Sequence, residues 1–189
     1  DFELYSKSFV NKNQLLISLA KDSLSKRLNA TYDNSMPYMS TGVEAPLAYV
    51  PMFALPQSPD VLLMLHNFFD AGNTFQGFNF NTLWDWSIAT IERCIQNNYQ
   101  ILIKPHPKAR SANYAAINEL TNLYADYDNV MWVPDNFPNR SLFALNPKLV
   151  ITGYGSVAVE ANFSGLPVLL AGRHPAVAFD IGYTAPSKV

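Results

Sequence analysis

Cysteine is almost absent from this sequence, since Cys94 is the only one among 189 residues. A single cysteine excludes a disulfide framework. Because Cys94 lies in an apolar stretch with helical spacing, we expect a buried thiol rather than a nucleophile or a metal ligand. Sparse cysteine usage of this kind is typical of a reducing compartment.

Charge is also scarce. The sequence has 13 Lys and Arg against 15 Asp and Glu, a formal net charge of −2, and the basic residues form no dense run. Duplex DNA or RNA binding needs a concentrated basic surface, so we expect no nucleic-acid partner. No apolar run approaches the roughly 20 residues of a membrane-spanning helix. The N-terminus also lacks a signal-peptide pattern.

Hydrophobic residues make up 49% of the chain, which is enough for a substantial core. The sequence predicts two parts. Residues 1–59 form a helical and Pro-rich connecting segment, with an amphipathic helix over 11–28, for which packing is the ordinary role, and a short extended piece at 47–50. Residues 60–189 form the main domain. The chain starts at Asp1 rather than Met, and we expect it to be an excerpt of a longer protein.

Strand and helix patterns alternate from Asp60 onwards. Short apolar runs, typical of strands buried on both faces, fall at 61–65, 101–103, 130–133, 149–152 and 168–170. Helical patterns lie between them at 84–98, 112–126 and 141–145, and another starts at Val157. Alternation of this kind predicts an α/β fold with a parallel sheet, helices on both faces and right-handed crossovers.

The most informative stretch is the turn Gly153-Tyr154-Gly155-Ser156 between a strand and a helix. Glycine can adopt positive φ and admits a ligand close to the backbone, and Ser156 is placed to cap the helix. The start of this helix would favour a phosphate, and Glu160, one turn further on, could accept hydrogen bonds from ribose hydroxyls. The alternative is an ordinary capped helix whose glutamate complements the dipole.

Two other polar segments follow predicted strands, where ligands of open α/β sheets bind. In Lys104-Pro105-His106-Pro107 the prolines restrict the backbone, so His106 is a held imidazole that could donate to a phosphate, with Lys104 adjacent. The alternative is a structural histidine. The loop after the first strand contains Asp70, which could serve the site or build a turn. The histidines lack metal-ligand spacing, so no metal is expected.

These motifs together with Gly165-Leu166-Pro167 resemble the nucleotide-binding, C-terminal half of GT-B glycosyltransferases. Within them the sequence is similar to the bacterial capsule polysaccharide biosynthesis type, which shares a His-Pro motif with sialic acid and Kdo transferases that use CMP-sugars. The resemblance covers roughly residues 47–186, the span over which the alternating pattern holds. It implies a Rossmann-like domain that binds a nucleotide-sugar donor.

In that family the histidine of the His-Pro pair and the Ser or Thr after the glycine turn contact the donor phosphate, and the helix glutamate holds the ribose. The resemblance therefore implies that His106, Ser156 and Glu160 form the donor site, beside Gly155, Lys104 and Asp70. It implies a glycan acceptor, metal-independent transfer without a cofactor, and a location in the cytoplasm or at the periphery of the inner membrane. The catalytic base usually comes from an N-terminal domain, and none is assigned here.

Two alternatives stay open. One is a polyol-phosphate polymerase resembling the CDP-glycerol glycerophosphotransferases, which share the His-Pro turn. Those enzymes usually carry Asp-Tyr-Ser-Ser at the glycine turn, from which Gly153-Tyr154-Gly155-Ser156 departs. The other is a non-catalytic sugar or nucleotide binding module, because such sheets host many functions.

Overall fold

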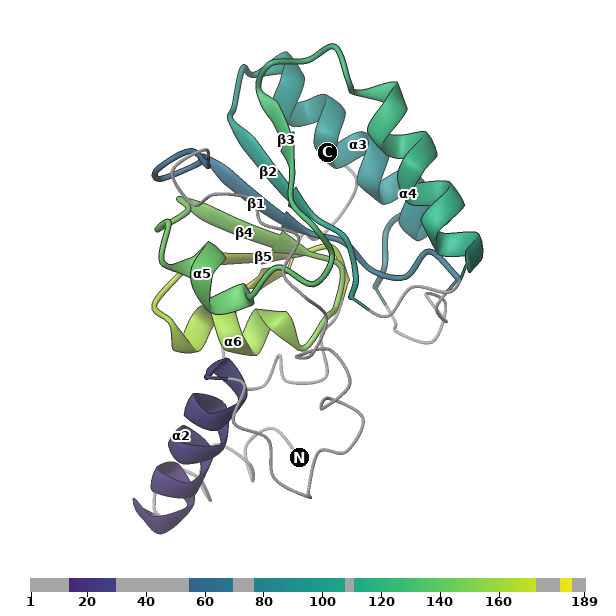
Figure 1. Cartoon of the computed structure of the whole chain (residues 1–189). Helices are drawn as coiled ribbons and strands as arrows, with labels where there is room; N and C mark the ends of the chain where they lie inside the picture. Colours follow the sequence, from purple (N-terminus) through teal and green to yellow (C-terminus); the bar gives the residue numbers. More distant parts are fainter. Residues whose placement is uncertain (1–13, 30–54, 70–76, 108–110, 173–180, 185–189) are drawn as a thin grey trace.

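The computed structural model describes residues 14–29, 55–69, 77–107, 111–172 and 181–184. Helices and strands alternate along the described chain after an isolated first helix (Figure 1). The helices are α2 (Gln14–Leu28), α3 (Leu83–Gln96), α4 (Ser111–Leu123), α5 (Asn139–Phe143) and α6 (Val157–Phe163). The strands are β1 (Val61–Met64), β2 (Ile101–Lys104), β3 (Val130–Trp132), β4 (Leu149–Thr152), β5 (Val168–Leu170) and β6 (Tyr183–Thr184).

All six strands form one parallel sheet in the order β3-β2-β1-β4-β5-β6. The predicted Rossmann-like α/β fold with helices on both faces is confirmed. The strand order reverses direction between β1 and β4, which pair in register from Val61 with Leu149 to Met64 with Thr152. In open sheets of this kind the ligand crevice lies beyond the carboxyl ends of the strands at such a reversal.

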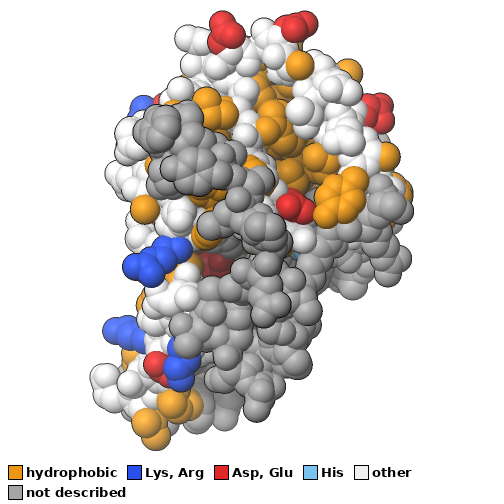
Figure 2. Space-filling view, in the orientation of Figure 1, with side chains coloured by type: hydrophobic (Ala, Val, Ile, Leu, Met, Phe, Trp, Pro, Cys, Tyr) orange, Lys and Arg blue, Asp and Glu red, His pale blue; other side chains and the backbone are white. Residues whose placement is uncertain are grey.

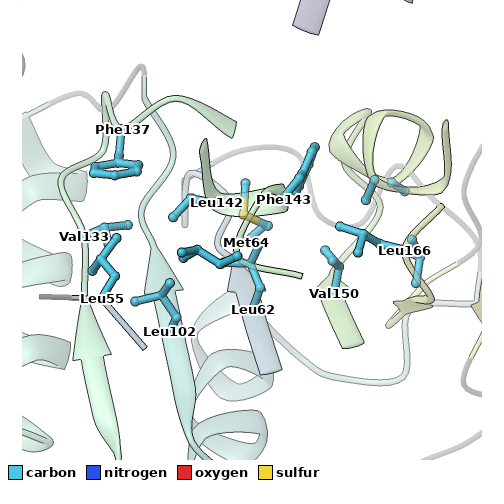
Figure 3. Packing of buried hydrophobic residues seen from close by; sticks show 14 of the residues in the cluster. Leu55, Leu62, Met64, Leu102, Val133, Phe137, Leu142, Phe143, Val150 and Leu166 are labelled. Atoms are coloured by element: carbon cyan, nitrogen blue, oxygen red, sulfur yellow. The ribbon is translucent and has the colours of Figure 1, made fainter. Parts of the chain in front are cut away.

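Alternate residues of each strand supply two separate cores, because successive side chains point to opposite faces of the sheet. Leu62 and Leu102 face α5 and α6, whereas Leu63 and Ile103 face α3 and α4, and all four are fully buried. Figure 1 shows the two helical layers on either side of the sheet. Figure 3 shows the first core, in which Met64 and Val150 from neighbouring strands meet the side chains of α5 and the segment after α6.

Helix α3 begins and ends by local sequence signals. Thr82 is its N-cap, with a side chain that accepts a hydrogen bond from the backbone N–H of Asp85 at 3.0 Å, and Asn97 is its C-cap. Its buried apolar residues are Leu83, Trp86, Ile91 and Cys94. Trp84, Ile88 and Ile95 are partly buried and pack against the same core.

Helix α2 confirms the predicted helix over the residues that the structure describes, but its expected packing role is wrong for most of its length. None of its residues is buried, and Leu15 and Leu19 are 68% and 54% exposed. Only its last residue, Leu28, packs against the core beside α6. The extended piece predicted at 47–50 lies outside the described residues. None of the described helices combines the length and apolar character needed to cross a bilayer.

Candidate functional site

His66 occupies the point where the strand order reverses. It follows β1, and its ring lies against the turn that follows β4. Its Nε2 atom accepts a hydrogen bond from the backbone N–H of Tyr154 at 3.3 Å and lies 3.2 Å from Oγ1 of Thr152. The imidazole is buried, with the ring of Tyr154 at 4.6 Å between centroids. His66 therefore joins the ends of the two central strands.

This histidine gives a physical reason for the two glycines of the turn. Neither Gly153 nor Gly155 adopts positive φ, so the conformational role considered for them is not used. A Cβ atom on Gly153 would lie 3.1 Å from Cδ2 of His66, and one on Gly155 would lie 3.1 Å from Cε1 of the same ring. The close approach that the glycines permit is made by the protein's own imidazole.

Ser156 does not cap α6, contrary to the prediction. Its backbone is already helical, with φ −59° and ψ −17°, and its side chain makes no capping hydrogen bond. A capping residue normally has extended backbone, which directs its oxygen to the free N–H groups of the first turn. The exposed Ser156 Oγ instead accepts a hydrogen bond from Nη2 of Arg27 at 2.8 Å.

Glu160 is the centre of a polar network on the α5 and α6 side of the sheet. Its side chain is buried, and Oε1 accepts a hydrogen bond from Nε of Arg27 in an ion pair. Oε2 accepts from Nδ2 of Asn139 at 2.8 Å, and Oδ1 of Asn139 accepts from Nζ of Lys104 at 2.6 Å. Four separate elements, α2, β2, α5 and α6, thus meet in one chain of hydrogen bonds.

The lysine of this network is buried at the end of β2. Burial lowers the pKa of Lys104 to about 8, against the opposing effect of the negative charges of Glu160 and Asp135. A pKa of about 8 leaves the ammonium mostly charged at pH 7. Two cations, Lys104 and Arg27, therefore lie on either side of the Glu160 carboxylate, and Asp135 is a second carboxylate that acts on Lys104.

The predicted site residues have different outcomes. Lys104, Ser156 and Glu160, which lie far apart in the sequence, belong to the same network. Gly155 precedes Ser156 in the turn, and His106, half-buried, follows β2 at the same carboxyl edge. Asp70 lies outside the described residues.

Three residues of the site were missed from the sequence: Arg27, Asn139 and His66. Asn139 starts α5, whose predicted start fell two residues later, at Ser141. Arg27 lies 133 residues before Glu160 and carries no local motif that could reveal the contact. His66 follows a buried strand, and that position was the signal that could have identified it.

The described residues contain no group of three or more His, Cys, Asp or Glu side chains that could hold a metal ion. The sequence contains one Asp-x-Asp triplet, Asp126-Tyr127-Asp128. It is exposed and lies between α4 and β3, at the amino end of the sheet and away from the network.

The sheet and its helices define a Rossmann-like α/β domain. A sequence model of the alpha-2,8-polysialyltransferase (POLYST) family matches residues 44–161, which is more than half of the chain. The chain belongs to this family. No curated protein sequence matches it significantly.

One solved structure shares the fold at low sequence identity, and a second matches more weakly. The UDP-GlcNAc 2-epimerase of Methanocaldococcus jannaschii, solved with UDP-GlcNAc and UDP, superimposes with a TM-score of 0.54 and 14% identity, over 87% of this chain and 41% of its own. The wall teichoic acid polymerase TagF matches with a TM-score of 0.44 and 16% identity, over 88% of this chain and 38% of its own. This chain therefore spans less than half of the length of either structure.

Proposed function

We propose that this chain is the donor-binding domain of a glycosyltransferase that builds a cell-surface polysaccharide. The observation that carries the proposal is the network in which Lys104, Glu160 and Arg27 meet at the carboxyl edge of a Rossmann-like sheet. Membership of the alpha-2,8-polysialyltransferase family supports sialic acid as the transferred sugar, and so a CMP-activated donor of the His-Pro group.

The charges of the site support a phosphate ligand. Lys104 and Arg27 bring two positive charges to the network, and the carboxylates of Glu160 and Asp135 bring two negative ones. A phosphate would therefore be attracted by the placement of the two cations rather than by a net charge, and cations in a partly buried site attract an anion more strongly than they would in water. A nucleotide phosphate is the anion that a sugar donor brings.

Each predicted residue has a role in this proposal. Ser156 Oγ and the Gly155 backbone lie beside the phosphate, and His106 donates to it from the end of β2. Lys104 supplies positive charge from the end of β2, and Glu160 lies on the side of α6 that faces the ribose. Asp70 stays a predicted contributor. The departing phosphate of the donor would be stabilised by these donors and cations, which is the dominant catalytic effect expected of preorganised polar groups.

The acceptor glycan and the catalytic base belong, in this proposal, to a second domain that faces the carboxyl edge of the sheet. The share of 41% that the chain covers in the solved epimerase supports a larger protein. The protein would work in the cytoplasm, at the inner face of the membrane where surface polysaccharides are assembled.

Calorimetric titration of the chain with CMP, CDP and UDP tests the proposal. We expect CMP to bind and the His106→Ala variant to bind it at least tenfold more weakly, because a hydrogen bond to a charged group contributes about 1.5–3 kcal/mol. Lys148→Ala is the matched control, since Lys148 is exposed and pairs with Asp60 at the opposite edge of the sheet. A folded chain that binds none of the three nucleotides would contradict the proposal.

A further inference from the structure

The last turn of α2 is bonded to the network around Glu160, although no residue of the helix is buried. Arg27 donates to Glu160 and Ser156, and Leu28 packs against the core. Asn29 Oδ1 accepts a hydrogen bond from Nη1 of Arg140 at 2.6 Å. Three successive residues thus hold the end of α2 beside α5 and α6. Figure 2 shows Lys and Arg side chains on this side of the molecule.

Glu160 needs Arg27 as a partner. Only 6% of the Glu160 side chain is exposed, and Arg27 is the cation that neutralises it. A buried carboxylate that loses its cationic partner is strongly destabilised, and the neutral hydroxyls of a ribose cannot replace that charge. A bound nucleotide is therefore expected to leave the Arg27 and Glu160 pair in place.

Arg27 keeps hydrogen-bonding capacity after these contacts. A guanidinium has five N–H donors, of which Nε serves Glu160 and one on Nη2 serves Ser156. Its side chain is 18% exposed, three times the exposed fraction of Glu160. A planar guanidinium with free donors is well suited to the oxygens of a phosphate. Ser156, to which Arg27 is bonded, is the exposed hydroxyl assigned to that phosphate.

We propose that Arg27 binds the phosphate of the nucleotide donor next to Ser156, and that Glu160 is the positioning residue that orients its guanidinium. This inference rests on the proposed function and adds to the donor site a residue, Arg27, that comes from α2 rather than from the sheet. It also changes the main role of Glu160 from holding the ribose to holding Arg27. The site then receives one cation from β2, Lys104, and another from α2.

The test compares CMP with cytidine, which lacks the phosphate, on the wild-type chain and on Arg27→Ala. We expect the substitution to weaken CMP binding by about tenfold to a hundredfold, the range that a charge-assisted hydrogen bond covers. Cytidine binding, followed by ligand-observed NMR because it is weak, should not change. Lys26→Ala is the matched control, because Lys26 is the next residue of the same helix and its exposed side chain pairs with Asp22.

A second variant distinguishes the loss of the phosphate contact from a loss of binding through unfolding. Arg27→Ala combined with Glu160→Gln removes the buried carboxylate together with its partner, so no charge is left unpaired. The double variant should lose CMP affinity as Arg27→Ala does, and should keep cytidine. The inference is wrong if Arg27→Ala binds CMP as tightly as the wild-type chain does, or more tightly. It is also wrong if the variant loses as much affinity for cytidine as for CMP. In each of these cases the proposed function stands. If the wild-type chain binds neither CMP, CDP nor UDP, both are overturned.

Discussion

The imidazole of His66 accepts a hydrogen bond from the backbone N–H of Tyr154 across the reversal point of the sheet. The two rings also lie against each other, with planes inclined by 40°. This contact fixes the turn after β4 from the neighbouring strand β1. The shape of the proposed donor site therefore depends on a histidine that sequence motifs alone would leave out.

We expect Gly155→Ala to destabilise the protein by about 1–3 kcal/mol, the usual cost of overpacking. The new Cβ would lie 3.1 Å from Cε1 of His66 and 3.2 Å from Oγ1 of Thr152. His66 cannot easily yield, because it is buried against the rings of Tyr154 and Trp86. Urea denaturation of the two proteins measures the difference.

The same substitution should cost clearly less in a His66→Ala background, where the clash with the ring is gone. Gly165→Ala is the control. Gly165 has φ +80° and an added Cβ there would meet no atom within 4 Å, so its cost comes from the backbone and should be equal in both backgrounds. Equal costs for Gly155→Ala in the two backgrounds would show that His66 is not the cause.

Glu160→Ala should destabilise the protein by about 3 kcal/mol or more, because it leaves the half-buried cation of Arg27 and the amide of Asn139 without their partner. Ser156→Ala should cost less than about 0.5 kcal/mol, since Ser156 is exposed and does not cap α6. A true N-cap would cost about 1 kcal/mol. Thermal and urea unfolding of both variants would reverse this order if Ser156 were the anchor of the turn.

We expect Lys104 to make the free energy of unfolding increase at alkaline pH. Its pKa is lowered by burial to about 8 in the folded protein, against an ordinary value of 10.5. The unfolded chain therefore binds more protons between these pH values, and the free energy of unfolding should increase from about pH 8 to pH 10.5. Urea denaturation across this range measures the slope. Lys104→Met should flatten it, and an unchanged slope in that variant would assign the effect to another group.

Cys94 should be unreactive in the folded protein. Burial, and secondarily the negative charge of Asp60, raises the pKa of its thiol to about 11. Because the thiolate is the reactive form, a thiol-labelling reagent at pH 8 should modify the native chain very slowly and the urea-unfolded chain rapidly. Rapid labelling of the native chain would mean that α3 opens readily from the sheet.

The sheet could be predicted because its information is local. Continuous apolar runs such as Val61–Met64 and 101–103 identify buried parallel strands, and the alternating order then leaves few topologies. β6 was missed because it has two residues and Tyr183 in it is 76% exposed, so no apolar run marks it.

The site could be predicted only in part, because its bonds are long-range. Lys104 and Glu160 were found since each sits next to a strand end or a helix start. The link between them passes through Asn139, and the partner of Glu160 comes from a helix that the sequence assigned to packing. The capping rule failed at Ser156 because it assumes extended backbone, and the chain is already helical there.

The contact between Arg27 and Glu160 spans 133 residues, so the order in which the chain is synthesised affects when the site forms. During synthesis at about 5–20 residues per second, Arg27 leaves the ribosome roughly 7–27 s before its partner. Closing so long a loop comes late, after the local strand and helix pairs have formed. A nascent chain would therefore carry the paired strands β1 to β4 before it carried a complete site, and binding would begin only after Arg27 had met Glu160.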